Sequence, residues 1–459
     1  MTVSSLPAPK SDRQDRPQGT RRPLSAIEIE PSESQAGIAN ETERPGEAKQ
    51  GPTEGDRAPL RARHVAVIGG GAAGMASAIA AARAGSSVTL IEATPKLGGT
   101  MSNALLHTLA GLYDGDGHHV NQGLAQELEN RLISADPEHV RPRKMAKLWV
   151  LSVDPSVYQQ VTSDWVSKEP NIEIRLGAHV TKVLCQQQRV REIEVFHAES
   201  TEVMAVDALI DCTGSGAALR LIDPGLHWTD AQDSAGGLIF CLRDVRPGAL
   251  RFPRRVGVLR ALREAARDGR LPANCAHAWA DAGIAPDEVY VKLFVPLHGD
   301  WNDCVPQLTE NARNDQAAVV QFLRTLSDFR DAKVTRSGIL GVRDGGRVRA
   351  ERTLTGADVL AGRRFDDVAC RCAWPIELWT PDRGVEIQYL PAGTIYDIPM
   401  SALKVMGITN AWTAGRSLCA DNRAQASARC VGTCWAMGAA VGNAAALSHD
   451  ERRFPEDPR

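Results

Sequence analysis

The sequence predicts an α/β fold organised around a parallel β-sheet, and three observations predict it. A short apolar run at 65–68 leads into closely spaced glycines, an alanine-rich helix and a second apolar run at 88–91. A third run, 208–212, ends in a turn of small residues, and a fourth, 411–414, follows much later. Continuous apolar runs that alternate with helices are typical of strands buried on both faces of a parallel sheet.

The turn after the first strand contains Gly69, Gly71 and Gly74 in G-x-G-x-x-G spacing. The first glycine permits a tight turn, the second lets the backbone approach a pyrophosphate, and the third lets helix and strand pack closely. The N-terminus of the next helix can hold phosphate oxygens. Glu92 ends the second strand, where a carboxylate can accept hydrogen bonds from a ribose. A glycine-rich turn in an ordinary α/β protein is the alternative, but this complete order favours dinucleotide binding.

Composition excludes several other classes. The 459 residues suffice for two or three domains, and 43% hydrophobic and 24% charged residues are ordinary for a soluble protein. A net charge of −3 does not support general nucleic-acid binding. Ten cysteines without a C-x-x-C or zinc-ligand pattern predict reduced thiols in a cytoplasmic protein and no metal site. The longest apolar run, 431–447, is short for a membrane span and predicts a buried helix.

Both chain ends are expected to lie outside the folded part. Residues 1–62 are rich in Pro, Glu, Arg, Ser and Gly and contain no aromatic residue, which predicts a disordered tail. Their many acids argue against an organelle transit peptide, and they lack the apolar core of a signal peptide. Residues 451–459 are expected to form a C-terminal tail.

The stretch after Glu92 predicts further elements in order. Gly98-Gly99-Thr100 suits a second backbone approach to a phosphate or a planar ring, with a surface turn as the alternative. Helices are expected at 122–133 and 155–168, separated by a basic run at 141–147 that is interpreted as a solvated face. Alternating residues predict antiparallel strands at 172–184, 189–196 and 202–206.

Residues 226–394 differ in character. Strand-like runs at 237–242 and 289–295 alternate with helical runs at 256–267 and 311–327, and no second glycine fingerprint occurs. This pattern predicts a substrate or cap domain inserted into the nucleotide-binding domain. The chain then returns through a loop and short turn at 396–403, the strand at 411–414, a polar loop and the final helix.

Together these features resemble the glutathione-reductase-like FAD flavoproteins and, more narrowly, the FAD-dependent oxidoreductases. Residues 341–379 and 396–447 carry the narrower resemblance. It implies an α/β fold with a Rossmann-like FAD-binding domain (parallel sheet plus β-meander) and an inserted α+β substrate/cap domain. The FAD-binding domain would comprise 63–225 and 395–450, with a helical excursion at about 115–170, and the cap domain 226–394.

The resemblance also implies non-covalent FAD. Val180 would contact the adenine through its backbone, and the start of the last helix at Gly432 would face the flavin O2. A helix N-terminus there favours the reduced, anionic flavin. The implied cofactor-binding residues are Gly69, Gly71, Ala72, Ala73, Gly74, Glu92, Ala93, Gly98, Gly99, Thr100, Val180, Thr213, Gly214, Gly415, Arg416, Gly432, Thr433 and Cys434.

Candidates for chemistry each have a structural alternative. Arg429 lies three residues before Gly432 and can bind a substrate carboxylate, or form a structural salt bridge. His107 lies in an apolar run and can act as a general base, although a hydrogen-bonded core histidine is the more ordinary role. Arg343 and Arg347 can bind an anion, but a structural role is favoured. Cys430 and Cys434 are interpreted as small buried residues rather than a redox pair.

The expected activity is that of an FAD-dependent dehydrogenase or oxidase, in which a small organic substrate transfers a hydride to flavin N5. Oxygen or another acceptor would reoxidise the flavin. A flavin-dependent monooxygenase and a flavin electron-transfer subunit of a larger complex are the alternatives. The expected partners are a small-molecule substrate and either a second copy or a partner protein, with no nucleic acid and no membrane.

Overall fold

The computed structural model describes residues 62–229, 234–297, 304–381 and 383–448. All of these residues belong to one compact unit. The predicted N-terminal tail, apart from its last residue, and the predicted tail at 451–459 lie outside the described residues.

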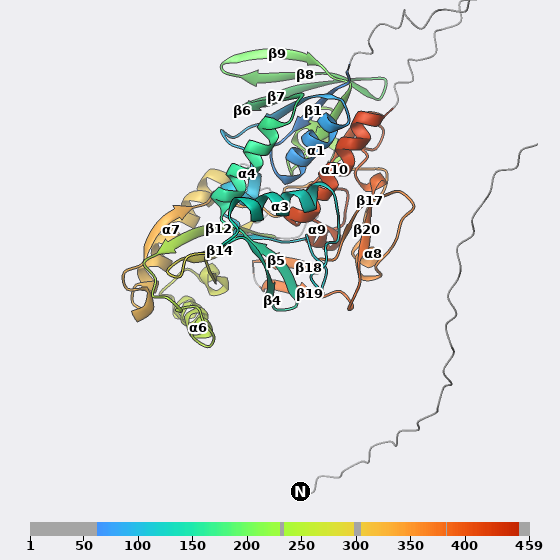
Figure 1. Cartoon of the computed structure of the whole chain (residues 1–459). Coiled ribbons are helices and arrows are strands. Elements are labelled where there is room, and N and C mark those ends of the chain that lie inside the picture. The colour runs from blue at the N-terminus through green and yellow to red at the C-terminus, as the bar shows by residue number, and fades with distance from the viewer. Residues whose placement is uncertain (1–61, 230–233, 298–303, 382, 449–459) are drawn as a thin grey trace, which may run out of the picture. The chain divides into compact units, whose positions relative to one another are not determined.

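A parallel five-stranded sheet lies at the centre of this unit (Figure 1), with the order β21-β10-β1-β2-β6. Its strands are β1 (His64–Ile68), β2 (Ser87–Glu92), β6 (Ile172–Leu176), β10 (Ala208–Asp211) and β21 (Ala411–Thr413). The four apolar runs of the sequence are therefore confirmed as neighbouring strands. Because parallel strands end at the same edge, the glycine turns that follow β1, β10 and β21 meet there.

The two faces of this sheet carry different layers. Alternate residues of β1 point to opposite sides. Val65 and Val67 pack in a core with the helices, whereas Ala66 and Ile68 pack in a second core with an antiparallel β-meander. The helices on the first face are α1 (Ala72–Arg83), α3 (Leu124–Ala135), α4 (Pro155–Lys168) and α10 (Val431–Leu447). The meander consists of β7 (His179–Gln186), β8 (Arg189–His197) and β9 (Ser200–Ala205).

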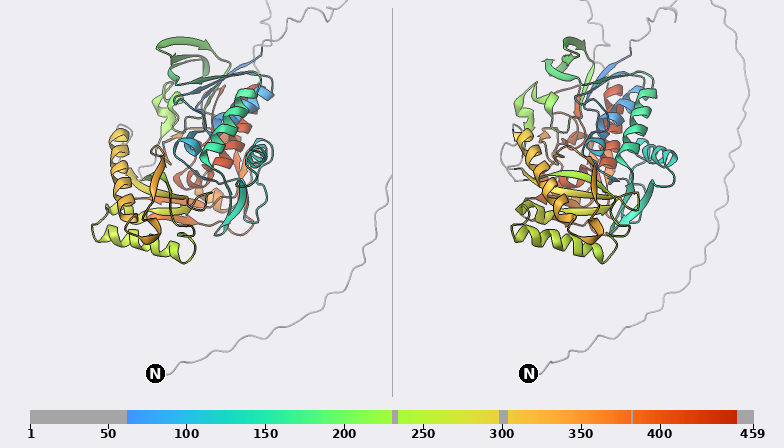
Figure 2. Two further views of the ribbon diagram at one scale, coloured as in Figure 1. Left: turned by 60° about the vertical axis from the view of Figure 1, so that its left-hand side comes forward. Right: turned by 90° about the vertical axis from the view of Figure 1, so that its left-hand side faces the viewer.

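Helices α1 and α10 come from opposite ends of the described chain and lie side by side (Figure 2). Gly438 and Gly442 make this approach possible, because a Cβ on either would collide with a carbonyl oxygen of α1, that of Ala73 or Ser77. The Ser77 hydroxyl also donates a 3.0 Å hydrogen bond to the Gly438 carbonyl. The buried helix expected at 431–447 is confirmed with these bounds.

One strand prediction on this side is corrected, and the basic run interpreted as a solvated face lies in a hairpin with mostly exposed residues. The expected strand 172–184 is broken at Gly177, whose φ of +65° ends an extended chain, so its first half joins the parallel sheet and its second half begins the meander. The basic run at 141–147 belongs to a hairpin, β4 (Arg141–Met145) with β5 (Leu148–Ser152), and β3 (Thr108–Leu109) pairs with β5. The expected helical excursion therefore contains a small sheet between its two helices.

A second antiparallel sheet has the order β13-β14-β12-β15. Its strands are β12 (Ser234–Arg243), β13 (Trp279–Ala282), β14 (Val289–Leu297) and β15 (Lys333–Ser337), and it packs with α6 (Arg254–Arg267) and α7 (Val305–Leu323). The strands and helices expected in this region are all present. The hydrophobic core that these elements share contains residues between Leu238 and Leu340. Buried residues from Leu354 to Leu403 pack instead in the core between the parallel sheet and its helices. The cap-domain bounds of 226–394 stay a prediction, but the separate core is shorter.

The remaining elements surround the C-terminal return of the chain. They are α2 (Gly99–Asn103), α5 (Ala217–Arg220), β11 (His227–Trp228), β16 (Arg347–Val348), α8 (Gly356–Leu360), β17 (Val368–Cys372), β18 (Ile376–Thr380), β19 (Gly384–Gln388), β20 (Tyr396–Pro399) and α9 (Asn422–Ala428).

The prediction of loops at two places in the C-terminal return is wrong. Residues 396–399 form strand β20, which pairs with β17. The polar loop before α10 contains α9, where the Asp421 side chain accepts a hydrogen bond from the Ala424 amide and caps the helix start. Among the described residues, no single helix has the length and hydropathy to cross a membrane. Helices α9 and α10 reach that only as a pair bent by 94°.

Candidate functional site

The glycines after β1 have the geometry that their spacing predicts. Gly69 has a φ of +103°, and its amide donates a 2.7 Å hydrogen bond to the carbonyl of Ile91. A Cβ on Gly74 would collide with the Gly69 carbonyl oxygen, so only glycine lets α1 begin this close to β1. In the described chain, the amides of residues 71–74 donate to no protein acceptor, and they surround the start of α1.

The second glycine turn lies directly against the first. The Gly98 amide donates a 2.9 Å hydrogen bond to the Gly70 carbonyl. Gly99 has a φ of +53°, and a Cβ there would lie 2.8 Å from the Cα of Gly71. Gly98 and Gly99 therefore pack against the first glycine turn, and the approach of Gly98-Gly99-Thr100 to a phosphate or a planar ring stays a prediction.

Glu92 lies where the sequence places the ribose acid, but part of its carboxylate is already engaged. It accepts hydrogen bonds from the Gly70 amide at 2.6 Å and the Thr94 amide at 2.8 Å. A carboxylate has about four acceptor positions, so it keeps capacity for a ribose hydroxyl. The Ala178 amide donates to the Glu92 carbonyl at 3.1 Å, which brings the strand that carries Val180 beside Ala93 and the acid.

The turn after β10 connects to the turn after β21. The Thr213 hydroxyl donates to the fully buried Asp211 at 2.7 Å. Gly214 has a φ of +74°, and its carbonyl accepts a 2.9 Å hydrogen bond from Arg416 Nε. Arg416 also donates to the Val342 carbonyl. Thr213, Gly214 and Arg416 are therefore brought together, as predicted.

Gly415 joins the starts of α1 and α10. A Cβ on Gly415, whose φ is +90°, would lie 3.2 Å from the Ala73 Cβ and 3.9 Å from Cys434 Sγ. Two of the donors predicted at α10 are occupied: the Gly432 amide donates to Ala110 and the Cys434 amide to Cys430. The amide of Thr433 has no protein acceptor in the described ranges. Of the amides of Gly432, Thr433 and Cys434, it is therefore the one that is free to donate to a ligand.

The two catalytic candidates lie in different surroundings. His107 is 3% exposed, stacks on Tyr290 with ring centroids 4.1 Å apart, and lies 3.9 Å from a carboxylate oxygen of Asp281. Burial, together with the charge of Lys292, lowers the pKa of His107 to about 3. Arg429 instead ends α9 and donates to the Glu377 carbonyl at 3.0 Å. The contacts of the described residues connect His107 with β13 and β14 rather than with Arg429.

The two other arginine candidates, Arg347 and Arg343, also differ in their surroundings. Arg347 is fully buried, pairs with Asp344 at 2.8 Å and lies over Trp228, which suits the favoured structural role. Arg343 has no carboxylate partner among the described residues and stacks on Trp379 at 3.7 Å. Trp379 was not identified as a candidate. Its only sequence signal is the pair of tryptophans at 374 and 379, and no local pattern connects them to Arg343.

The cysteines near α10 are free thiols in the structure. Burial raises the pKa of Cys434 to about 12 and that of Cys430 well above its usual range. A protonated thiol is a poor nucleophile. Cys434 is buried, as expected of a small core residue, whereas Cys430 is only partly buried.

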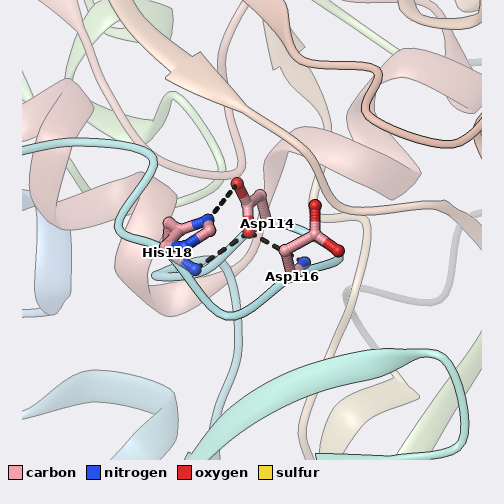
Figure 3. A group of neighbouring side chains, drawn as sticks. All are labelled: Asp114, Asp116 and His118. Atoms are coloured by element: carbon pink, nitrogen blue, oxygen red, sulfur yellow. Dashed lines mark hydrogen bonds and ion pairs between the residues drawn. The ribbon is translucent and has the colours of Figure 1, made fainter.

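A loop after β3 brings Asp114, Asp116 and His118 together (Figure 3). One Asp114 oxygen accepts hydrogen bonds from the amides of Asp116 and His118, both at 2.9 Å. The side chains of Asp116 and His118 are exposed. These bonds account for the loop without any ligand.

The fold and site define a dinucleotide-binding α/β protein, and comparison with known proteins makes the class specific. The family described as "FAD dependent oxidoreductase" matches residues 64–457. The chain therefore belongs to the FAD-dependent oxidoreductase family, and its cofactor is FAD. No curated protein matches the sequence.

Solved structures give only distant likenesses. A geranylgeranyl bacteriochlorophyll reductase-like protein from Thermoplasma acidophilum has 10% identity and a TM-score of 0.45, with 84% of this chain and 77% of that chain covered. A p-nitrophenol 4-monooxygenase from Pseudomonas putida has 13% identity and a TM-score of 0.37, covering 63% and 70%. An anhydrotetracycline hydroxylase from Streptomyces rimosus has 16% identity and a TM-score of 0.38, with 64% of this chain and 54% of that chain covered. Likenesses this distant say nothing about substrate or reaction.

The residues present fit FAD. Gly69, Gly74 and Gly99 let the turns and the start of α1 pack against one another, because a Cβ at each would collide with neighbouring backbone. The unpartnered amides at the start of α1 suit a pyrophosphate. Glu92 suits the ribose. The predicted contact of each residue with FAD stays a prediction, but the structure brings both glycine turns and the two helix starts to one place.

Proposed function

We propose that this protein is an FAD-dependent dehydrogenase or oxidase that acts on a small organic substrate. One observation carries the proposal: Gly415 lies between Ala73 of α1 and Cys434 of α10, so two helix N-termini meet at one cofactor cradle. When bound, FAD supplies a hydride acceptor at N5. The Thr433 amide and the N-terminal dipole of α10 then stabilise negative charge beside the flavin.

The role proposed for His107 follows from its surroundings. Its two ring nitrogens have no hydrogen-bond partner within the described chain, and its low pKa keeps it neutral at pH 7. A neutral imidazole can accept a proton, but the stack on Tyr290 holds this ring at the second sheet. We therefore propose that His107 positions that sheet and does not itself remove the substrate proton.

The first experiment asks whether the cradle holds FAD. Gly99→Ala is expected to lose most bound flavin, because its Cβ would reach the Gly71 backbone at a positive φ. Gly393→Ala is the matched control: Gly393 also has a positive φ, +73°, but nothing lies within 4 Å of an added Cβ. Flavin content of the purified proteins, measured by absorbance, is the readout. Equal flavin loss in both variants would contradict the cradle.

The second experiment separates the candidate activities. We expect anaerobic bleaching of the flavin by an organic substrate alone. Reduction that requires NAD(P)H, with oxygen incorporated into the product, would instead support a monooxygenase. Reduction that requires another protein would support an electron-transfer subunit. A colourless protein that takes up no added FAD would contradict all three activities.

A further inference from the structure

Three arginines, Arg343, Arg416 and Arg429, form what we call the arginine recess. Arg343 Nη1 donates to the Ala235 carbonyl at 2.9 Å, and Arg416 donates to the carbonyls of Gly214 and Val342. Arg429 donates to the Glu377 carbonyl and to the Gln425 side chain. In the described part of the chain, none of the three forms an ion pair with a carboxylate. Their side-chain hydrogen bonds therefore go only to neutral oxygens.

The nearest acids, Glu377 and Asp344, offset these charges only in part, because they act from a distance and form no ion pair with the three arginines. The Glu377 carboxylate accepts hydrogen bonds from the indoles of Trp374 and Trp379, at 3.1 and 2.6 Å. Asp344 pairs with Arg347 at 2.8 Å. An uncompensated cation inside a protein is costly, and such a site is favourable when an anion occupies it.

The three arginines of the recess are largely, but not completely, enclosed by protein. Burial, and after it the charge of Arg429, lowers the pKa of Arg343 to about 9, and burial lowers the pKa of Arg416 and Arg429 as well. All three nevertheless keep part of their surface accessible.

Neighbouring residues orient the guanidinium of Arg343. It lies 3.7 Å from the ring centroid of Trp379, and Trp379 in turn stacks on Phe294. A Cβ on Gly237 would lie 3.2 Å from Nη1 of Arg343, so a glycine leaves the room for this group. Because a guanidinium has five donors in a plane, Arg343 keeps donors free for a ligand after its bond to Ala235.

The recess lies beside the proposed flavin site. The Arg429 carbonyl accepts a hydrogen bond from Cys434 Sγ at 3.4 Å, and Arg429 precedes the first residue of α10 by two positions. Arg416 directly follows Gly415. The phosphate cradle is formed by the glycine turns and the start of α1, which leaves Arg343 and Arg429 without a role in holding FAD phosphates.

Resting on the proposed function, we propose that Arg343 and Arg429 bind the carboxylate of a small organic acid, which is the substrate. Arg416, held by two carbonyls, contributes positive charge behind them. Planar guanidinium groups bind carboxylates through paired hydrogen bonds, so the two arginines fix the orientation of the acid as well as its charge.

The test uses the purified protein with its bound FAD, after the flavin content has been measured. The probes are acetate, succinate and benzoate, each compared with its uncharged amide. Binding is followed by the shift of the flavin absorption bands and independently by calorimetry. We expect the acids to bind at concentrations at which the amides do not. Acids and amides that bind alike, or acids that do not bind at all, would overturn the assignment.

Variants identify the residues responsible. Arg343→Gln and Arg429→Gln are each expected to weaken acid binding about ten- to a hundredfold, as when one charged partner of a buried hydrogen bond is removed. The control variant is Arg423→Gln. Arg423 is exposed and lies in α9, the helix that precedes Arg429, so this variant should bind the acids as the wild type does. Wild-type affinity in both recess variants would overturn the assignment.

The outcomes also separate this proposal from the proposed function. Protein that holds FAD and is bleached by a neutral substrate would contradict the acid site and leave the oxidoreductase standing. Protein that binds the acids by calorimetry, but in which no substrate reduces the flavin, would support the acid site and contradict the proposed activity.

Discussion

Two groups of partly buried residues that contain arginine have opposite chemistry in this molecule. At the domain junction, which we define as His107, Asp154, Glu288, Tyr290 and Arg336, the guanidinium is fully neutralised. Arg336 forms two bonds to the Asp154 carboxylate, at 2.9 and 2.8 Å, and a third to Glu288 at 3.0 Å. In the arginine recess, the acceptors are carbonyl oxygens.

The difference indicates what each cluster does. At the junction, Asp154 also caps α4, so the ion pairs connect a helix of the parallel-sheet half to β15 of the second sheet. Burial alone would raise the pKa of Asp154, but Arg336 holds it below its usual range. A satisfied cluster of this kind holds the fold together. The recess keeps its charge excess for a molecule that the chain does not supply.

The largest effect is expected at the junction. Arg336→Met would leave Asp154 and Glu288 buried without their cation, and should lower the free energy of unfolding by about 3 kcal/mol or more. Urea unfolding followed by circular dichroism measures this. Adding Asp154→Asn and Glu288→Gln to the variant should recover much of the loss, because the orphaned charges are then removed. A stable single variant would mean that the junction pairs contribute little.

A smaller effect is expected from His107, and it depends on pH. The folded pKa of about 3 lies below the usual 6.5, so only the unfolded chain takes up this proton as the pH falls. Stability is therefore complete above about pH 6.5 and falls by up to about 1.4 kcal/mol per pH unit down to pH 3.

Unfolding measured from pH 7 to pH 4 checks this slope. His107→Gln should flatten it, whereas His118→Gln, in an exposed loop, should leave it unchanged. An identical slope in wild type and His107→Gln would show that His107 is protonated in the folded protein.

The smallest stability effect is expected in the recess. Arg343→Met and Arg429→Met remove desolvated charges that form no ion pair and that Glu377 offsets only from a distance. Each should therefore change the free energy of unfolding by less than about 1 kcal/mol. For Arg343→Met, loss of the cation–π contact with Trp379 opposes any increase in stability from removing the charge. The same unfolding measurement applies. A loss as large as that of Arg336→Met would erase the contrast between the two clusters.

Much of the fold follows from local sequence patterns. The helix 155–168 begins with Asp-Pro, a cap and a preferred first residue, and its predicted bounds agree with α4. The G-x-G-x-x-G unit was equally clear. Strand β20 and the hairpin at 141–152 have no comparable signal. Polar and apolar residues do not alternate regularly along them, and β20 pairs with a segment distant in the sequence. The break at Gly177 depends on a positive φ that the sequence does not reveal.

The candidate site was predictable only in part. The glycine turns and Glu92 carry their own signals, and the resemblance connected them to Gly415 and the last helix. Arg429 was a candidate, but its neighbour Arg343 was favoured as structural because nothing in the sequence shows whether a carboxylate faces it. The roles of Trp379 and of the glycine at Gly237 depend on contacts between separate sheets, which local patterns do not encode.

The contact between α1 and α10 has a consequence for biosynthesis. The first nucleotide-binding element is translated well before Gly438 and Gly442, which seat α10 against it. A chain that ends before residue 431 lacks the second helix start at the site. We therefore expect a protein truncated there to be purified without bound flavin.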